Sequence, residues 1–481
     1  MGTNRWLVVV VGACSGLVAQ PPRSARVATV ASRVSTSAAR DDAPEARRRG
    51  GRSRAEALPG LHAVGDVVEV RVDRLSNLGD GVGRLEASGL VCFVPFSVPG
   101  ELISARVVEV SATFARCAVV AVIEKSPDRD TPQCSLYGVC GGCQLQHMTL
   151  SSQRLWKRNF VIDALQRIGG LEVEVAEVVG GAGYGYRAKL TPHFFPPKRI
   201  GELFPIGFYA ASRARGVTDV PRCDIATDAI NIRMATLREE TQARYRNNPV
   251  PPRGSTLLLR QHEGGVETDP RAGVEEHVGG VDFQLEAGEF FQNNPQVLPY
   301  LVDYVLAEAT NDGKATGLID AYCAPQGGVR NVSHGTRLGG GGLFALTGAS
   351  RFGSVAGVDI SKHNVAAAKA NAKRNGLDNV VFEAGDAEEL FKPLASSFDP
   401  SCTTVIMDPP RKGASKSFLD QLAAFRPLRI VYVSCDSATQ ARDAKELVRR
   451  GYLAKRAQPF DLFPQTRHVE NVITFDLELR V

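Results

Sequence analysis

The spacing of hydrophobic and polar positions changes along the chain. Between His62 and Glu124, short alternating apolar stretches are separated by glycine turns, which predicts a small all-β barrel. From Leu150 to Ile168, apolar residues recur at helical spacing with Lys157 and Arg167 on the other face, which predicts a surface helix. Between about Val173 and Val281, short strands mix with proline-rich loops, a pattern that indicates a central domain but not its topology.

From about Phe283 onward, apolar runs that predict strands alternate with stretches that predict helices. Strands are expected at Val355–Ile360, Thr404–Met407 and Arg429–Ser434, and helices at Ser361–Asn375 and Ser437–Arg449. This alternation is typical of a parallel sheet covered by helices. The fold class is therefore α/β, with a doubly wound, Rossmann-like domain behind an N-terminal β-barrel and a mixed central domain.

The chain has 481 residues, enough for about three domains that each bury a core. We expect a targeting segment and linker at 1–56, the barrel at 62–124, the central domain at 125–282 and the α/β domain at 283–481. A net charge of +5 tolerates a polyanionic partner without establishing one. Because no run of about 18 uninterrupted apolar residues occurs, we expect no membrane span.

The N-terminal 40 residues have the composition of a transit peptide. They contain no Asp or Glu, many Ser and Ala, and five arginines, namely Arg5, Arg23, Arg26, Arg33 and Arg40. The short apolar stretch Trp6–Val18 fits the hydrophobic region of a signal sequence or a weak membrane-contacting patch. We expect import into an organelle, either mitochondrion or plastid, and the alternative is an untargeted tail on a cytoplasmic protein.

Three cysteines fall on one tight loop, Cys134-x5-Cys140-Gly-Gly-Cys143, where the glycines let the backbone fold back so that the sulfurs converge. Cys223 is the nearest downstream candidate for a fourth ligand. A Cys-x2-Cys pair alone more often binds zinc, but zinc modules usually provide a second pair, so the set favours an iron–sulfur site. The scattered cysteines favour a reducing compartment. The thiols expected to stand alone are Cys14, Cys92, Cys117 and Cys402.

The segment Val431–Cys435 is an apolar strand that ends in a cysteine, and Glu470 follows later in the chain. A thiolate can add to an electron-poor ring carbon such as that of uracil, and a carboxylate can remove a proton from the adduct. Alone, each residue is more often a core cysteine or a solvated glutamate. With Asp408-Pro-Pro-Arg411 nearby in the chain, they predict a nucleophile and a base. The helix that follows Cys435 is expected to lower the pKa of its thiol.

Two strand ends predict a nucleotide pocket. In a doubly wound sheet, ligands lie at the carboxyl ends of the strands. Leu318–Cys323 is a buried strand that leads toward a glycine-rich turn, and Val355–Ile360 ends in an acid. Asp359 is expected to accept hydrogen bonds from ribose hydroxyls, and Asp386 from an adenine amine. These motifs fit any nucleotide-binding protein of this fold.

Further segments resemble one family, the RNA uridine-5-methyltransferases, and stand in the family's order. They are Gly288–Asn294 before a helix, Asp408–Gly413 after a strand, and Cys134–His147. The barrel, through Gly79–Arg84 and Pro95–Glu101, resembles the TRAM domain, an OB-like barrel that binds RNA. The alternative is an ordinary small barrel that binds no nucleic acid. The resemblance runs from about His62 to the C-terminus.

The resemblance implies an S-adenosylmethionine-dependent enzyme that acts on tRNA or rRNA to form 5-methyluridine. We expect this enzyme to be a monomer. It implies a structural or RNA-positioning 4Fe-4S cluster on the four cysteines. Residues matching positions that contact S-adenosylmethionine or the adjacent base are Gln292, Tyr322, Asp359, Asp386 and Asp408.

The chemistry would begin with addition of the Cys435 sulfur to carbon 6 of uracil, because carbon 5 is otherwise a poor nucleophile. Carbon 5 then takes the methyl group, Glu470 removes the carbon 5 proton, and elimination releases Cys435. Asp408 and Arg411 are expected to bind the uracil edge or balance the enolate charge. His468 either orients Glu470 or caps a turn. The target uridine should lie in a loop or be flipped out.

One departure from the family is the stretch Ala324–Gly342, nineteen residues where relatives have about three. It is a bulge, a translated intron, or an insertion that abolishes cofactor binding, and Gly339–Gly342 can still supply the turn. The last case motivates the alternative function, an RNA-binding or folding protein with a disabled methyltransferase domain. Methylation of an amino nitrogen is disfavoured, because Arg411 stands where such enzymes usually carry an aromatic residue.

Overall fold

The computed structural model describes residues 62–197, 199–211, 216–323, 341–385 and 397–478. All of them belong to one compact unit, Glu56–Val481. The expected targeting segment and Asp386 lie outside the described residues. Among the residues described, none of the helices has the length and hydrophobicity needed to span a bilayer.

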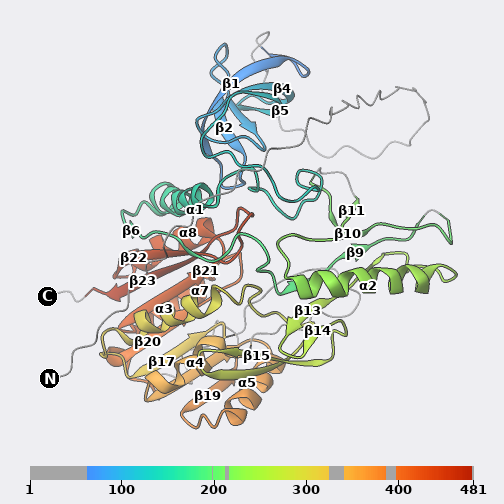
Figure 1. The fold of residues 1–481 in the computed structure, drawn as a ribbon. Coiled ribbons are helices and arrows are strands. Elements are labelled where there is room, and N and C mark those ends of the chain that lie inside the picture. Colours follow the sequence, from blue (N-terminus) through green and yellow to red (C-terminus); the bar gives the residue numbers. More distant parts are fainter. Residues whose placement is uncertain (1–61, 198, 212–215, 324–340, 386–396, 479–481) are drawn as a thin grey trace, which may run out of the picture. The chain divides into compact units, whose positions relative to one another are not determined.

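The first five strands form a closed barrel in the order β1-β2-β3-β5-β4 (Figure 1). The strands are β1 Val67–Leu75, β2 Gly81–Arg84, β3 Val91–Val94, β4 Leu102–Val110 and β5 Phe114–Glu124. Gly83 is required in β2, because a Cβ atom there would lie 2.2 Å from the carbonyl oxygen of Arg71. The predicted barrel is therefore confirmed, and alternation along its strands gives it a core of its own.

Two cysteines that were expected to stand alone meet inside this barrel. Cys92 on β3 and Cys117 on β5 are both buried, with their sulfurs 3.0 Å apart. The expectation that they have no companions is wrong, because they are 25 residues apart in sequence and only the pairing of the barrel strands brings them together.

The central region contains helix α1 (Leu150–Ala164), which continues into η1 (Leu165–Gly169), and helix α2 (Asp228–Tyr245). The predicted helix is present, but Lys157 does not face solvent. Its side chain is 0% exposed and its ammonium lies 2.5 Å from Asp461, so the expectation of a solvent-facing lysine is wrong. The acid that pairs with Lys157 is 304 residues away in sequence.

Small sheets complete the central region. One has the order β11-β10-β9-β12, another β14-β13-β8, and β15 pairs with β16 in a hairpin. Their bounds are β8 Lys189–Leu190, β9 His193–Phe194, β10 Ile206–Tyr209, β11 Val217–Asp219, β12 Ser255–Thr256, β13 Leu259–His262, β14 Gly265–Glu267, β15 Gly273–Val278 and β16 Val281–Glu286.

The large sheet has the order β19-β18-β17-β20-β21-β23-β22-β6, and β7 also pairs with β22. The strands from β19 to β21 are parallel, whereas β23 is antiparallel to both neighbours. The bounds are β6 Glu174–Val175, β7 Val179–Gly180, β17 Gly317–Ala321, β18 Ser354–Asp359, β19 Val380–Ala384, β20 Thr403–Met407, β21 Arg429–Ser434, β22 Tyr452–Asp461 and β23 Glu470–Leu477. The predicted α/β fold is confirmed.

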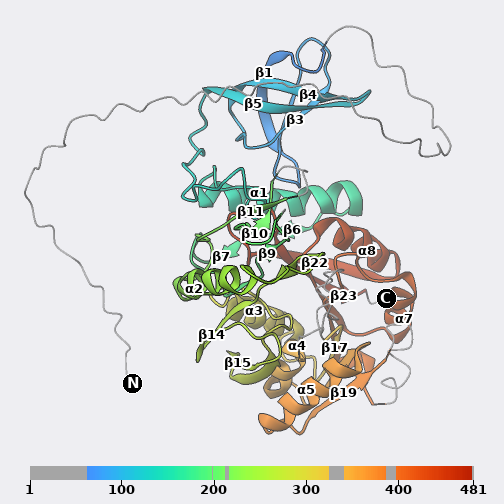
Figure 2. The same cartoon turned by 90° about the vertical axis from the view of Figure 1, so that its right-hand side faces the viewer.

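Helices cover both faces of this sheet (Figures 1 and 2). Alternate strand residues point into two separate cores. One core contains residues of α3 (Leu298–Thr310), α4 (Leu343–Gly348) and α5 (Lys362–Arg374). The other contains residues of α1, α7 (Lys416–Phe425) and α8 (Ser437–Arg449). Because α1 packs on this sheet and β6 is one of its strands, the central region helps to build the α/β domain.

Candidate active site

The predicted site residues follow one edge of the large sheet. In the register of the parallel strands, Ala321 of β17 lies between Val358 of β18 and Met407 of β20. The residues that come next, Asp359, Tyr322 and Asp408, therefore lie side by side at the carboxyl ends of these strands. This is the edge at which doubly wound sheets bind ligands.

Cys435 and Glu470 lie at the same edge, on the neighbouring pair of strands. Ser434 at the end of β21 is paired with Asn471 of antiparallel β23, so Cys435 and Glu470 form the next opposed pair. Opposed residues of antiparallel strands project from the same face, with Cβ atoms about 4.5–5.5 Å apart. The Glu470 side chain is buried and Cys435 is half-buried. The register therefore places the predicted nucleophile beside the predicted base.

The Cys435 thiol is held protonated in the free protein. Burial raises its pKa to about 12, and the carboxyls of Glu470 and Asp408 add to this effect. The charge of Arg411 and its hydrogen bond to the thiol act in the opposite direction. The expected lowering of this pKa by the following helix is wrong, because burial outweighs it. Asp436 also caps α8 and accepts hydrogen bonds from the amides of Ala438 and Thr439. The N-cap carboxylate offsets the helix dipole near the sulfur.

The two carboxyls at this edge are shifted in the same direction. Burial raises the pKa of Glu470 well above its usual range, Asp408 raises it further, and Arg411 opposes the shift. Burial also raises the pKa of Asp408. A carboxylate with a raised pKa is a stronger base near neutral pH, which suits removal of a proton from carbon.

His468 precedes Glu470 by two residues. Burial and the nearby charge of Arg411 lower the pKa of His468 to about 4, so its ring is neutral at pH 7. The ring packs edge-on against Phe463, with centroids 6.2 Å apart. Its backbone amide donates to the hydroxyl of Thr466.

Two predicted cofactor residues are held in defined conformations. Tyr322 has a left-handed backbone, with φ of 67°, and its ring lies 5.0 Å from that of Phe418. Asp359 accepts hydrogen bonds through Oδ1 from the amide of Ser361, at 2.8 Å, and from the side chain of Asn364, at 3.0 Å. Strained backbone of this kind is concentrated at ligand sites.

Gln292 is half-buried in the loop after β16. Buried Arg260 holds this loop by donating to the carbonyls of Ala287 and Glu289. Asn294 donates to the carbonyl of Leu462, at 3.1 Å, which connects the loop to the segment that precedes Glu470. The loop is thus fixed at both ends relative to the sheet edge.

Sequence reasoning missed Asp320, a buried acid in β17. Its Oδ2 accepts a hydrogen bond from the amide of Ala345 in α4, at 3.0 Å, while its Oδ1 has no partner among the described residues. Burial raises the pKa of this carboxyl. An acid inside an otherwise apolar strand is the signal in the sequence that points to this residue.

The two ends of the connection between β17 and α4 are joined by a backbone hydrogen bond. The amide of Gly342 donates to the carbonyl of Cys323, at 3.1 Å. Gly342 has φ of +83°, and a Cβ atom there would lie 2.9 Å from the ring of Phe382. The expectation that the last glycines supply the turn is met by Gly342, while residues 324–340 lie outside the described part of the chain.

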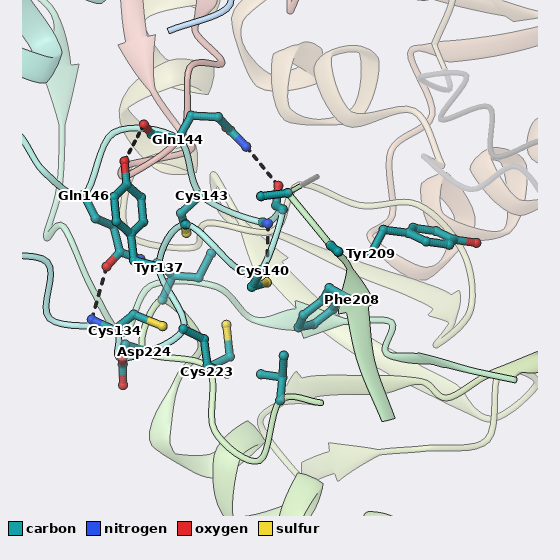
Figure 3. A pocket seen from close by; sticks show the side chains of 18 of the residues that line it. Cys134, Tyr137, Cys140, Cys143, Gln144, Gln146, Phe208, Tyr209, Cys223 and Asp224 are labelled. Atoms are coloured by element: carbon teal, nitrogen blue, oxygen red, sulfur yellow. Dashed lines mark hydrogen bonds between the residues drawn. The ribbon is translucent and has the colours of Figure 1, made fainter. Parts of the chain in front are cut away.

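The four predicted cluster cysteines line one cavity of about 750 Å³ (Figure 3). Their side chains come from the Cys134–Cys143 loop and from the turn before α2, and Figure 3 shows their sulfurs facing a shared space. Burial raises the pKa of Cys143 to about 12, and the thiols of Cys223, Cys140 and Cys134 contribute to the rise, which reflects their proximity. Within the described ranges, no group of three His, Cys, Asp or Glu side chains is arranged to hold a single metal ion.

Two known family models match this chain. The family model for tRNA (Uracil-5-)-methyltransferase matches residues 280–477, and the TRAM domain model matches residues 62–120. A "tRNA (uracil(54)-C(5))-methyltransferase" of Schizosaccharomyces pombe is 36% identical over 431 residues, covering 85% of this chain and 77% of the relative. The protein of that name in Saccharomyces cerevisiae is 30% identical over 487 residues, covering 85% and 73%.

A solved structure of Pyrococcus abyssi tRNA (uracil-54, C5)-methyltransferase in complex with S-adenosyl-L-homocysteine is also similar. Its TM-score is 0.62 at 24% identity, and the match covers 85% of this chain and 100% of that chain. This likeness supports the fold over nearly the whole described part. Taken with the sequence matches, it shows that the chain belongs to the tRNA (uracil-5-)-methyltransferase family, whose members use S-adenosylmethionine as the methyl donor.

Proposed function

We propose that this protein methylates carbon 5 of uridine 54 in tRNA through a transient covalent bond between Cys435 and carbon 6 of the base. The observation that carries the proposal is the opposed placement of Cys435 and Glu470 beside Asp408 at one sheet edge. The position within the RNA rests on the names of the two yeast relatives.

In the proposed reaction, the Cys435 thiol loses its proton to solvent and the thiolate sulfur adds to carbon 6. The electron pair of the carbon 5–carbon 6 double bond then moves toward the carbonyl to form an enolate. Carbon 5 would then form a bond to the methyl group of S-adenosylmethionine as the bond from that methyl group to the sulfonium sulfur breaks, which leaves S-adenosylhomocysteine. Glu470 then removes the proton from carbon 5, and the carbon–sulfur bond breaks to release Cys435 as the double bond returns.

Arg411 favours the ionised states in this sequence, because its charge and its hydrogen bond both stabilise the thiolate of Cys435. The raised pKa of the thiol also makes Cys435 a strong nucleophile once it is deprotonated. Asp408 adjoins both groups and raises the pKa of each.

The methyl donor would be held at the same edge by Gln292, Tyr322, Asp359 and Asp408. The chain fits such a ligand, because Asp320 presents a buried oxygen that has no partner in the described part of the chain, and Gly342 leaves no room for a Cβ atom beside Phe382. Asp386, outside the described residues, stays a prediction for the adenine amine. Retention of this pocket favours an active enzyme over the alternative of an RNA-binding protein with a disabled domain.

We also propose that Cys134, Cys140, Cys143 and Cys223 hold a 4Fe-4S cluster. Four thiols around one cavity match the ligand set of such a cluster. When bound, the cluster would fasten the Cys134–Cys143 loop to the turn before α2, and no step of methyl transfer requires its electrons. Iron and sulfide analysis of anaerobically purified protein, with visible absorption, tests this proposal, and zinc without iron would contradict it.

Two further proposals rest on the sequence. The acid-free, arginine-containing N-terminus is proposed to direct import into a mitochondrion or plastid. A reporter fused behind residues 1–56 tests this, and a reporter that stays in the cytoplasm would contradict it. The protein is proposed to act as a monomer, which light scattering coupled to size-exclusion chromatography measures.

The catalytic proposal is tested with tRNA in which 5-fluorouridine replaces uridine. Fluorine at carbon 5 cannot leave as a proton does, so the adduct should persist as a gel-shifted conjugate in the presence of S-adenosylmethionine. Cys435→Ala should form none, whereas Cys402→Ala, which removes a cysteine outside the site, should form it normally. Heat from titration with S-adenosylmethionine separates an active enzyme from a disabled one. Binding of the donor without any conjugate would contradict the covalent mechanism.

A further inference from the structure

The segment Phe463–His468, called here the base turn, leads directly into Glu470 at the start of β23. Its central residue, Gln465, is buried and has a left-handed backbone, with φ of 67°. A residue other than glycine adopts this conformation only where surrounding contacts hold it. The contacts of Gln465 therefore determine the conformation of the base turn.

The first contact comes from the cysteine loop. The carbonyl of Gln465 accepts hydrogen bonds from the amides of Gln144 and Leu145, both at 3.0 Å. These two residues follow Cys143 directly in the chain. A group bound to the Cys143 sulfur would therefore be connected to the base turn through the next two residues, whose backbone amides both donate to the Gln465 carbonyl.

The second contact comes from helix α1. The side-chain amide of Gln153 donates to Oε1 of Gln465, at 2.9 Å, and its Oε1 accepts from the backbone amide of Gln465, also at 2.9 Å. Gln153 is 0% exposed. Together with the cysteine loop, it satisfies the backbone donor, the backbone acceptor and the side-chain oxygen of Gln465.

Neighbouring residues of the base turn are held in the same way. The hydroxyl of buried Tyr186 donates to the carbonyl of Pro464, at 2.9 Å, and Lys157 donates to the carbonyl of Phe463, at 2.9 Å. Cys435, by contrast, directly follows β21 and precedes the capped start of α8. The base and the nucleophile thus depend on different supports.

We propose that Gln465 is a positioning residue through which the Cys134–Cys143 loop and Gln153 set the place of Glu470. This inference rests on the proposed function, in which Glu470 removes the carbon 5 proton. Loosening the base turn should then slow that late step and spare the earlier ones. The methylated adduct with Cys435 would accumulate on ordinary uridine, without any fluorine.

The test uses the full chain with tRNA carrying ordinary uridine and S-adenosylmethionine. Gln153→Leu removes both hydrogen bonds to Gln465 while keeping a side chain of similar size. We expect turnover to fall about tenfold and a covalent protein–tRNA complex to build up on denaturing gels. Glu470→Gln serves as the reference for a blocked late step. Gln166→Leu, the same substitution at an exposed residue of η1, should behave as the unchanged protein.

Tyr186→Phe provides a second, milder variant that removes one hydroxyl, and it should show the same accumulation to a smaller extent. The inference is overturned in either of two cases, provided that Glu470→Gln accumulates the covalent complex. In the first, both Gln153→Leu and Tyr186→Phe lose turnover but accumulate no complex. In the second, both variants keep full turnover. If Glu470→Gln itself accumulates no complex, the role of Glu470 in the proposed function fails, and this inference fails with it. A general weakening of the fold would reduce turnover without trapping the adduct.

Discussion

Glu470 combines its proposed catalytic role with an unfavourable environment. Its side chain is 3% exposed, and burial raises its pKa above the unfolded value of about 4.3. The folded state therefore binds the proton more tightly than the unfolded state, and stability decreases as pH rises through this interval. Catalytic groups commonly carry a stability cost of this kind.

Replacing Glu470 by Gln should consequently stabilise the protein at about pH 8 while abolishing turnover. Gln is neutral and of similar size, so it avoids the cost of ionising a buried carboxyl. We expect the thermal midpoint to rise by at least about 2 °C, which corresponds to about 1 kcal/mol for a domain of 150–250 residues. At about pH 4 the carboxyl is largely protonated in both states, and the difference should disappear.

Glu446→Gln, at a partly exposed residue of α8, is the matched comparison. Arg450 lowers the pKa of Glu446, so ionisation of this residue stabilises the fold and its removal should have the opposite sign at pH 8. Differential scanning fluorimetry across pH measures both variants. A midpoint for Glu470→Gln that is unchanged at pH 8, or raised equally at pH 4, would contradict the argument.

Arg411 and Cys435 give a second prediction. Because Arg411 lowers the pKa of the thiol, Arg411→Ala should leave less thiolate at any pH below the titration. We expect alkylation of Cys435 by iodoacetamide at about pH 9 to slow by about threefold to tenfold, since Arg411 is exposed and solvent screens its charge. Mass spectrometry of the Cys435 peptide measures the rate. Lys412→Ala is the control, and equal rates for both variants would refute the role of Arg411.

The sequence was sufficient to place several site residues but not to describe their environment. Cys435, Asp359 and Asp408 lie at strand ends that the apolar pattern locates. The direction of the Cys435 pKa shift depends on burial and on the carboxyl of Glu470, and both are arranged by the fold. The burial of Lys157 depends on an acid 304 residues away. Such long-range partners leave no periodic signal in one sequence.

At the scale of elements, periodicity predicted the strands and helices that are long enough to show it. Strands β17, β18, β20 and β21 alternate with helices as expected. Strands β6 and β7 have two residues each, too few for any pattern, and they join the sheet only by pairing with β22. The antiparallel insertion of β23 between β21 and β22 also escaped prediction, because a buried apolar strand looks the same in either direction.

The β17–α4 connection yields an element-scale prediction. Replacing residues 324–340 by a single glycine would leave three glycines between Cys323 and Leu343. The bond from the Gly342 amide to the Cys323 carbonyl would then become the i to i+3 bond of a β-turn. We expect the shortened protein to keep its thermal midpoint, its binding of S-adenosylmethionine by calorimetry, and its methylation of tRNA.

Gly342→Ala in the unchanged chain is the contrasting variant. Its Cβ atom would meet the Phe382 ring on a backbone with φ of +83°, so both stability and cofactor binding should decrease. If the shortened protein folds but no longer binds the donor, the replaced stretch contributes to the pocket and the argument fails.

At the scale of the whole molecule, the active site draws on distant parts of the chain. The cysteine cavity is lined by barrel residues such as Phe96, by the Cys134–Cys143 loop, and by central residues such as Phe208. The base turn is held by α1 and by the cysteine loop, more than 300 residues earlier in the chain. Folding of the catalytic edge therefore depends on the central region as well as on the α/β domain.

The buried pair of Lys157 and Asp461 is the sharpest case of this dependence. Both side chains are 0% exposed, and Lys157 also donates to the base turn through Phe463. Removing one member of a buried ion pair leaves an uncompensated charge and commonly costs about 3–5 kcal/mol. Arg154 lies 3.7 Å from Asp461 and offsets part of this loss, so Lys157→Met should fall near the lower end of that range.

Urea unfolding of Lys157→Met, Asp461→Asn and the double variant gives the interaction free energy of the pair as a double-mutant cycle. The double variant should be more stable than the less stable single variant, because it contains no unpaired buried charge. Arg167→Met, which removes an exposed partner of Asp163 at the end of the same helical segment, should leave the unfolding midpoint nearly unchanged. Equal effects of Lys157→Met and Arg167→Met would mean that the buried pair does not fasten α1 to the catalytic edge.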